Sequence, residues 1–157
     1  MSHLHATSRR QRMFQAALAG IGGGLAVAML AWFTERAHWP LLMGSFGSSA
    51  VIVFGFPDSA FSKARNVIGA HMLCATVGLL CLRLLGPSSL SAGMAVGLSI
   101  GLMLATRVVH PPAGSNPLLV FALQPGWGFL FMPALLGSLC LVLLARAWHR
   151  LHPRPLP

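Results

Sequence analysis

Hydrophobic residues in this chain are gathered into long runs, and short polar breaks separate the runs. A helix needs about 20 mostly apolar residues to cross the hydrocarbon core of a bilayer. Five of the runs reach or approach that length, although the second of them is loaded with Gly and Ser, whereas the fifth run along the chain is very short. We therefore expect helical segments over residues 13–33, 40–56, 67–85, 91–106, 118–123 and 129–147.

The first run follows a basic stretch, as a signal peptide would. It is about 20 residues long, however, and so exceeds the ~7–15 residues of a typical signal-peptide core. Its end also has no convincing small-x-small cleavage site. We expect a retained first span, in which four glycines allow another helix to approach closely. These glycines are Gly20, Gly22, Gly23 and Gly24.

Composition points to the same class of protein. Hydrophobic residues make up 55% of the 157 residues and charged residues only 8%, with Glu35 and Asp58 as the two acids. Soluble domains need about a quarter of their residues charged to keep their surface in water. The sequence therefore predicts an all-α, polytopic transmembrane helical bundle. We expect one membrane domain over residues 13–148, between basic tails at 1–12 and 149–157.

The charges also predict an orientation. A net charge of +9 would suit nucleic acid, but the basic residues form no helical face with interleaved aromatics, so we expect no nucleic-acid partner. Basic residues that flank spans mark the cytoplasmic side of a membrane. Six crossings place both basic termini, the loop with Lys63 and Arg65, and Arg107 on that side. Five crossings would put the basic C-terminus on the other side. We expect cytoplasmic termini in a bacterial inner membrane, with tryptophans at run ends as an interfacial belt: Trp32, Trp39, Trp127 and Trp148.

A weak internal repeat supports six crossings. Residues 47–54 match residues 114–121 when shifted by 67 positions, with four of eight residues identical. Each half, about 13–86 and 91–148, then has three segments, so the halves have opposite orientations. Inverted repeats of this kind are common in transporters, where short interrupted segments in matching positions indicate the binding site.

The interrupted segments have the chemistry of a small polar site. Unpaired backbone groups at a helix break are costly in lipid, so such breaks line cavities or are buried in protein. Proline can begin a helix, and the N–H groups and dipole at a helix start favour an anion. Serine and asparagine add side-chain donors. Without acids, this pocket suits a small anion or neutral solute better than a metal cation. The predicted substrate-binding residues are Gly44, Ser45, Gly47, Ser48, Ser49, His110, Pro111, Pro112, Gly114, Ser115 and Asn116. The competing interpretation is that these small residues only pack helices together.

His71 lies inside the third run, where an ionisable residue is a functional candidate. It could carry a proton coupled to transport, with Arg107 and Asn66 as further candidates for a proton or gating role. The alternative is a neutral histidine that donates a hydrogen bond to a nearby carbonyl. We expect no cofactor and no metal, because the cysteines lie within apolar runs, as small buried hydrophobes do. They are Cys74, Cys81 and Cys140.

Three motifs resemble the HPP family of integral membrane proteins. They are residues 44–51, residues 65–71 and Arg107-x-x-His110-Pro111-Pro112-Ala113-Gly114-x-Asn116-Pro117-Leu118. The three motifs follow one another along the chain in the order that the family has. The resemblance covers about residues 14–149. It implies a transporter, and some plant and cyanobacterial relatives are linked to nitrite transport. The family is often described with four spans, against the six expected here.

The sequence thus favours a membrane transporter or channel for a small anion such as nitrite, and not an enzyme. A non-transporting scaffold or assembly subunit is the main alternative. A less favoured alternative is an intramembrane serine hydrolase that uses Ser48 or Ser49 with His71 or His110. It lacks a Gly-x-Ser-x-Gly motif and an evident third orienting group. The lipid bilayer is an expected partner, and the Gly-rich faces are compatible with a homo-oligomer.

Overall fold

The chain folds into a helical bundle. The computed structural model describes residues 8–38 and 40–153, and contains no strand within them. Trp39 of the predicted interfacial belt, and residues 1–7 and 154–157 of the predicted tails, lie outside the described residues. The helices are α1 (Arg9–Ala37), α2 (Ser45–Gly55), α3 (Ala64–Leu85), α4 (Ser89–Thr106), α5 (Asn116–Leu123) and α6 (Leu136–Leu151), with short segments η1 (Ala60–Ser62), η2 (Pro111–Ser115) and η3 (Leu130–Leu135) between them.

Four stretches are long and apolar enough to cross a membrane: Arg9–Arg36, Ala64–Leu85, Ser89–Thr106 and Trp127–Leu151. The helical membrane class is therefore confirmed. The predicted second and fifth segments form only the short helices α2 and α5, so a count of six full spans is not established. We had expected the second segment to begin at Pro40, but α2 begins at Ser45. The preceding backbone is held outside a helix, since the N–H groups of Leu41 and Leu42 donate to Thr34 Oγ1.

Local sequence sets several helix ends. Ser8 and Gln11 form a capping box that begins α1, so the basic residues from Arg9 belong to this helix and not to a separate tail. Gly86 ends α3 with a φ of 75°, a conformation that favours glycine. Ser88 then caps α4 together with Ser91. These caps satisfy backbone groups at the helix ends that have no partner within the helix.

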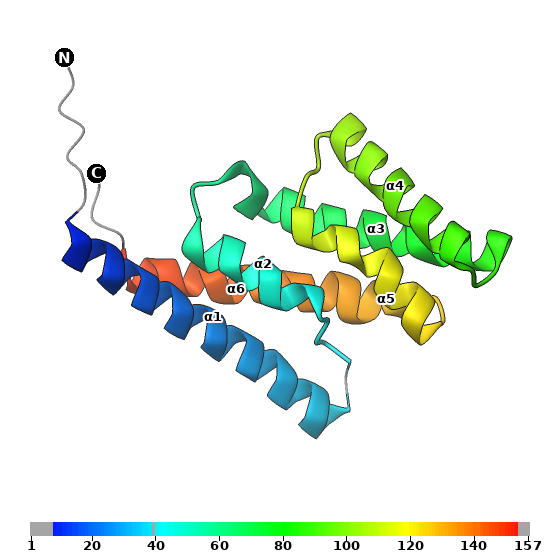
Figure 1. Cartoon of the computed structure of the whole chain (residues 1–157). Coiled ribbons are helices and arrows are strands. Elements are labelled where there is room, and N and C mark those ends of the chain that lie inside the picture. Colours follow the sequence, from blue (N-terminus) through cyan, green and yellow to red (C-terminus); the bar gives the residue numbers. More distant parts are fainter. Residues whose placement is uncertain (1–7, 39, 154–157) are drawn as a thin grey trace, which may run out of the picture.

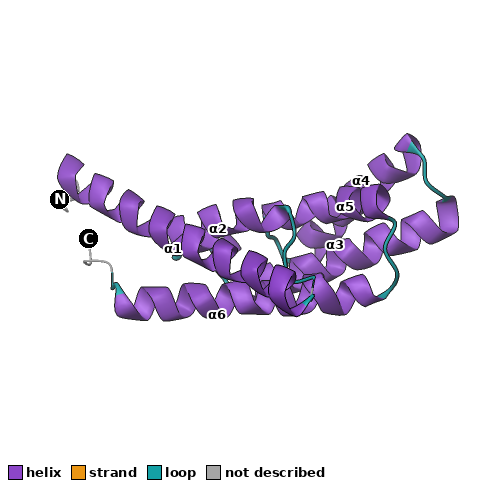
Figure 2. Cartoon of the chain, turned by 90° about the horizontal axis from the view of Figure 1, so that it is seen from below, coloured by secondary structure: helices purple, strands orange, loops and turns teal. Residues whose placement is uncertain are grey.

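Successive helices run back and forth along the long axis of the molecule, so that α1 begins and α6 ends at the same end (Figure 1). The short helices α2 and α5 point away from each other along this axis. Figure 2 shows the same elongated bundle from a perpendicular direction.

The helix α3 lies at the centre of the bundle. Half of its apolar window is buried, against 22% for α1 and for α4, whose outer faces remain apolar and exposed. The largest fully buried apolar side chains are Phe46, Phe54, Leu30, Leu79 and Leu141. Exposed apolar faces on the outer helices are expected where lipid is the solvent.

The second and third elements of the two predicted halves have similar bounds, whereas α1, which a shift of 67 residues places on residues 76–104, begins well before α4. Shifted by 67 residues, α2 falls on residues 112–122, whereas η2 and α5 together cover 111–123. The same shift places α3 on residues 131–152, whereas η3 and α6 together cover 130–151. Each half therefore consists of a long helix, a short one and another long one.

Candidate functional site

Five buried polar residues meet where the two short helices begin. Ser45 is 3% exposed, and the other four are fully buried. Two come from α2, one from α3, one from the segment before η2 and one from α5. They are Ser45, Ser49, His71, His110 and Asn116, which we call the polar junction. Buried polar groups persist where hydrogen bonds satisfy them, and each of these five has partners.

The first residues of α2 and α5 are joined directly. Ser45 Oγ donates to Asn116 Oδ1 over 3.0 Å. Asn116 Nδ2 donates in turn to the carbonyl oxygen of His71, at 3.2 Å. A carbonyl only accepts, so these two bonds fix which end of the Asn116 amide is the donor. The N-termini of two broken helices thus meet at one asparagine.

The protonation of both histidines follows from their partners. Asn116 Nδ2 lies 3.0 Å from His71 Nδ1, so Nδ1 accepts and neutral His71 carries its proton on Nε2. His110 Nδ1 lies 2.8 Å from the carbonyl oxygen of Phe61, so neutral His110 carries its proton there. Ser49 Oγ lies 3.2 Å from His71 Nε2 and 2.9 Å from His110 Nε2. It therefore accepts from His71 and donates to His110.

Close packing holds the polar junction in place. The ring of Phe46 meets that of His71 edge to face at 5.2 Å between centroids, and the His71 and His110 rings are 5.3 Å apart. Gly78 allows α3 to approach α5, because a Cβ there would lie 2.9 Å from Pro117 Cα. The buried polar residues that the structure describes are serine, asparagine and histidine only, so no permanent charge faces this cluster.

Other predicted site residues point elsewhere. Successive residues of a helix are about 100° apart, so Ser45 and Ser49 share the inner face of α2 while Gly47 and Ser48 are exposed. Ser48 Oγ donates to the carbonyl of Ser45, one turn back. Gly44 lines a different groove. The structure therefore brings together only part of the predicted serine and glycine set.

The residues around the His110–Asn116 break also differ in position. Pro112 is buried and Pro111 exposed, while Gly114 and Ser115 are half-buried. Ser115 Oγ donates to the carbonyl of Pro112, within its own turn.

The two gating candidates lie apart from the polar junction. Arg107 is exposed at the end of α4 with a φ of 55°. Asn66 is buried, and its Nδ2 donates to the carbonyl of Ala60, which ties η1 to α3.

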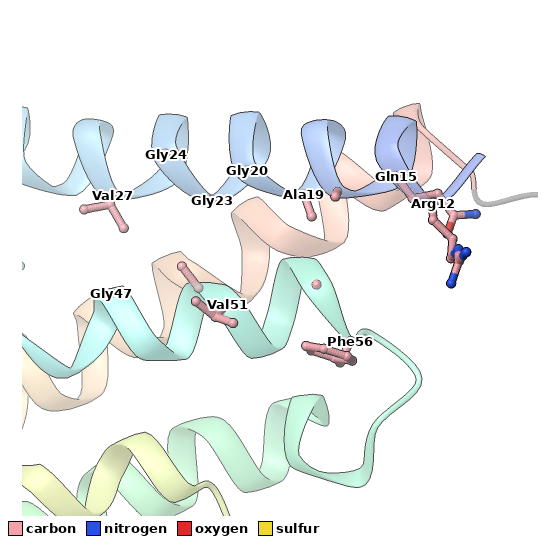
Figure 3. A pocket seen from close by; sticks show the side chains of 13 residues that line it. Arg12, Gln15, Ala19, Gly20, Gly23, Gly24, Val27, Gly47, Val51 and Phe56 are labelled. Atoms are coloured by element: carbon pink, nitrogen blue, oxygen red, sulfur yellow. The ribbon is translucent and has the colours of Figure 1, made fainter. Parts of the chain in front are cut away.

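Two grooves lie beside the short helices. The larger, of about 690 Å³, separates α1 from α2 and is lined by small residues such as Gly20 and Gly47, with Arg12 and Gln15 at one end (Figure 3). A second, of about 480 Å³, lies near Gly44 and the far end of α5. The polar junction lines neither groove, so it is closed in this structure.

The link from His71 through Ser49 to His110 is the feature that sequence reasoning missed. The two histidines were candidates for separate roles in transport, and only as alternative partners of a serine in the hydrolase interpretation. The repeat held a usable signal, because a shift of 67 places Ser49 on Asn116, and both residues bind the ring of His71.

Comparisons with known proteins agree with this architecture. The family described as "HPP, transmembrane region" matches residues 8–157. A Dictyostelium discoideum transmembrane protein is 37% identical over 132 residues, which cover 78% of this chain and 46% of the relative. A second from the same organism is 34% identical over 137 residues, or 82% of this chain and 44% of the relative. The chain thus spans less than half the length of these relatives. No solved structure matches it.

Proposed function

The chain belongs to the HPP transmembrane-region family and is an integral membrane protein, and from that premise we propose that it is a transporter or channel for a small solute. We propose further that the solute is a small inorganic anion, with nitrite as the first candidate. The single observation that supports this most strongly is the hydrogen bond between Ser45 and Asn116, which joins the buried N-termini of α2 and α5.

The proposal assigns the two short helices a shared role. Each runs only part of the way along the bundle, from the polar junction outward and in opposite directions. Transporters with inverted repeats bind solutes where discontinuous helices meet, and helix N-termini there face anionic groups. In this account the two halves are inverted repeats, and both ends of the chain face the cytoplasm of a bacterial inner membrane.

The chemistry of the polar junction favours an anion or a neutral polar solute over a metal cation. Ser45 Oγ–H becomes a donor for a solute's oxygens once it releases Asn116 Oδ1, and Asn116 Nδ2–H₂ becomes one once it releases His71. No buried carboxylate is present among the described residues to balance a cation. Because the junction is closed, solute access requires α2 or α5 to move, as gating in transporters commonly does.

Two other functions compete with this one. In a scaffold subunit, the same hydrogen bonds would only fix helix packing. In a hydrolase, Ser49 would be activated by His110, whose ring is oriented by the Phe61 carbonyl. Ser49 is fully buried and lines neither groove, which disfavours a hydrolase. A serine-directed fluorophosphonate that labels the wild type but not Ser49→Ala would support it.

The proposal is tested by flux into proteoliposomes that contain the purified protein. Nitrite, nitrate, formate and bicarbonate are supplied separately, with and without a pH gradient, and protein-free liposomes give the baseline. We expect flux of at least one anion, and loss of that flux in Asn116→Ala protein that still elutes as a folded species. Absence of flux for all four anions would reject the small-anion proposal and favour a neutral solute or a scaffold.

A further inference from the structure

The hydrogen bonds through Ser49 form a continuous path with one direction. We propose that His71, Ser49 and His110 form a proton relay between the helix junction at Asn116 and the η1 segment at Phe61. This inference rests on the proposed function and adds to it that the solute moves together with a proton. From here on we call these three residues the relay.

The order of donors along the path follows from the partners at its two ends, because the Asn116 amide nitrogen only donates and the Phe61 carbonyl only accepts. Asn116 Nδ2 donates to His71 Nδ1 at 3.0 Å, and His71 Nε2 donates to Ser49 Oγ at 3.2 Å. Ser49 Oγ then donates to His110 Nε2 at 2.9 Å, and His110 Nδ1 to the Phe61 carbonyl at 2.8 Å. Each histidine uses one nitrogen as acceptor and the other as donor, which is the arrangement that proton transfer through an imidazole requires. A hydroxyl shared by two such rings can pass a proton between them.

The transfer balances without any further reactant. A proton arrives at His71 Nδ1, from water or from the acid form of the solute, after the Asn116 amide turns away. His71 then loses its Nε2 proton to Ser49 Oγ, and Ser49 loses its own proton to His110 Nε2. His110 finally releases its Nδ1 proton to water at the exposed η1 segment near Phe61. Three bonds to hydrogen form and three break, and one proton has moved along the relay.

The two ends of the relay lie in different surroundings. The Asn116 end is the buried meeting point of α2 and α5, where the proposed function places the solute. The Phe61 end lies in η1, none of whose residues is buried, so a proton released there can reach the surface. The path therefore connects the proposed solute site with an exposed segment of the chain.

No permanent charge interrupts the path. Around the relay, α2 contributes Ser45 and Ser49, α3 contributes His71 with Cys74 one turn further on, and the segment before η2 contributes His110. No arginine, lysine, aspartate or glutamate is among the buried residues that the structure describes. Two neighbouring histidines repel when both are protonated, so the relay holds one excess proton at a time.

The relay is tested with proteoliposomes that contain a trapped pH-sensitive dye, so that solute and protons are measured together. The variants are Ser49→Ala, which removes the shared hydroxyl, and Ser49→Thr, which keeps it. Ser138→Ala is the matched control, because Ser138 is also buried but donates only to the carbonyls of Ala134 and Leu135 in the preceding turn. Protein-free liposomes correct for undissociated acid that crosses the bilayer unaided.

We expect the wild type, Ser49→Thr and Ser138→Ala to acidify the interior as solute enters, and Ser49→Ala to lose at least about tenfold in protons moved per solute. Wild-type solute flux without proton movement would overturn the relay and leave the proposed function standing. So would Ser49→Ala with an unchanged proton ratio. If Ser49→Ala stops both fluxes, the flux of the wild type is compared in D₂O and in H₂O. A slower flux in D₂O supports the relay, and an equal flux overturns it. Wild-type protein that carries neither solute nor protons would overturn both proposals.

Discussion

Ser49 and Asn116 bind opposite nitrogens of the same imidazole. Ser49 Oγ lies 3.2 Å from His71 Nε2, and Asn116 Nδ2 lies 3.0 Å from His71 Nδ1. A shift of 67 residues, the offset of the predicted repeat, superimposes the two positions in the sequence, so each predicted half contributes one residue to this histidine. Because His71 belongs to the central helix α3, this contact links both short helices to the middle of the bundle.

The two histidines are expected to be opposite tautomers. Nitrogen-15 NMR of histidine-labelled protein in lipid at neutral pH should show the His71 proton on Nε2 and the His110 proton on Nδ1, because their partners require it. The signals are assigned by comparison with His71→Gln and His110→Gln. The same tautomer at both residues, or a doubly protonated ring, would be inconsistent with the direction of the hydrogen bonds.

The path of the chain can be tested by labelling single cysteines from one side of the membrane. Cys74, Cys81 and Cys140 are first replaced by alanine, and then Ala60→Cys or Gly126→Cys is added at an exposed position. If α2 and α5 each take the chain to the other side of the bilayer, position 126 faces the outside of the cell and position 60 the inside. An impermeant maleimide outside intact cells should then label Gly126→Cys and leave Ala60→Cys unlabelled. Labelling of both from the same side would mean that a short helix returns to the side from which it entered.

Gly78 is expected to be intolerant of a side chain. A Cβ there would lie 2.9 Å from Pro117 Cα and 3.2 Å from Val120 Cβ, so alanine would push α5 away from α3. Overpacking of this kind costs about 1–3 kcal/mol, and the melting temperature of Gly78→Ala in detergent should fall. Gly97→Ala is the control, since nothing lies within 4 Å of its Cβ position. Equal melting temperatures for the two variants would contradict the close approach of α3 and α5.

Thr34 is expected to hold the backbone that leads into α2. Thr34→Val keeps the shape of the side chain but removes the oxygen that accepts from Leu41 and Leu42. Leaving a buried N–H without a partner costs about 1–3 kcal/mol, so hydrogen exchange of the segment after residue 38 should accelerate. Thr76→Val, whose hydroxyl bonds only within its own helix, should leave that exchange unchanged. Exchange in Thr34→Val that is as slow as in the wild type would mean that other contacts hold this segment in place.

The long helices could be predicted from sequence because each leaves a continuous apolar run, and their bounds depend on local signals such as Gly86 and the cap at Ser88. The start of α2 could not be predicted as well. Pro40 to Gly44 is as apolar as the helix that follows, and its path depends on a bond to Thr34, several residues back in the chain.

The candidate site was predicted only in part, and helix geometry explains which part. The Gly/Ser pattern identified α2 but could not tell that Ser45 and Ser49 face inward while Gly47 and Ser48 face outward. That choice depends on which face of α2 packs against α6 and η2, which the helical period alone does not give. The pairing of His71 with His110 depends on how η2 packs against α3, which no local pattern encodes.

Asn116, at the meeting point of the two short helices, is the central residue of the proposed solute site, and the anion flux of Asn116→Asp in proteoliposomes tests its role most directly. Aspartate has nearly the same shape but brings a negative charge to the proposed anion site and cannot donate to His71. Gln124→Glu makes the same charge change at the exposed far end of α5. We predict that wild type and Gln124→Glu carry the anion and that Asn116→Asp, folded to the same extent, does not. Flux through Asn116→Asp at the wild-type rate would contradict a solute site at the polar junction.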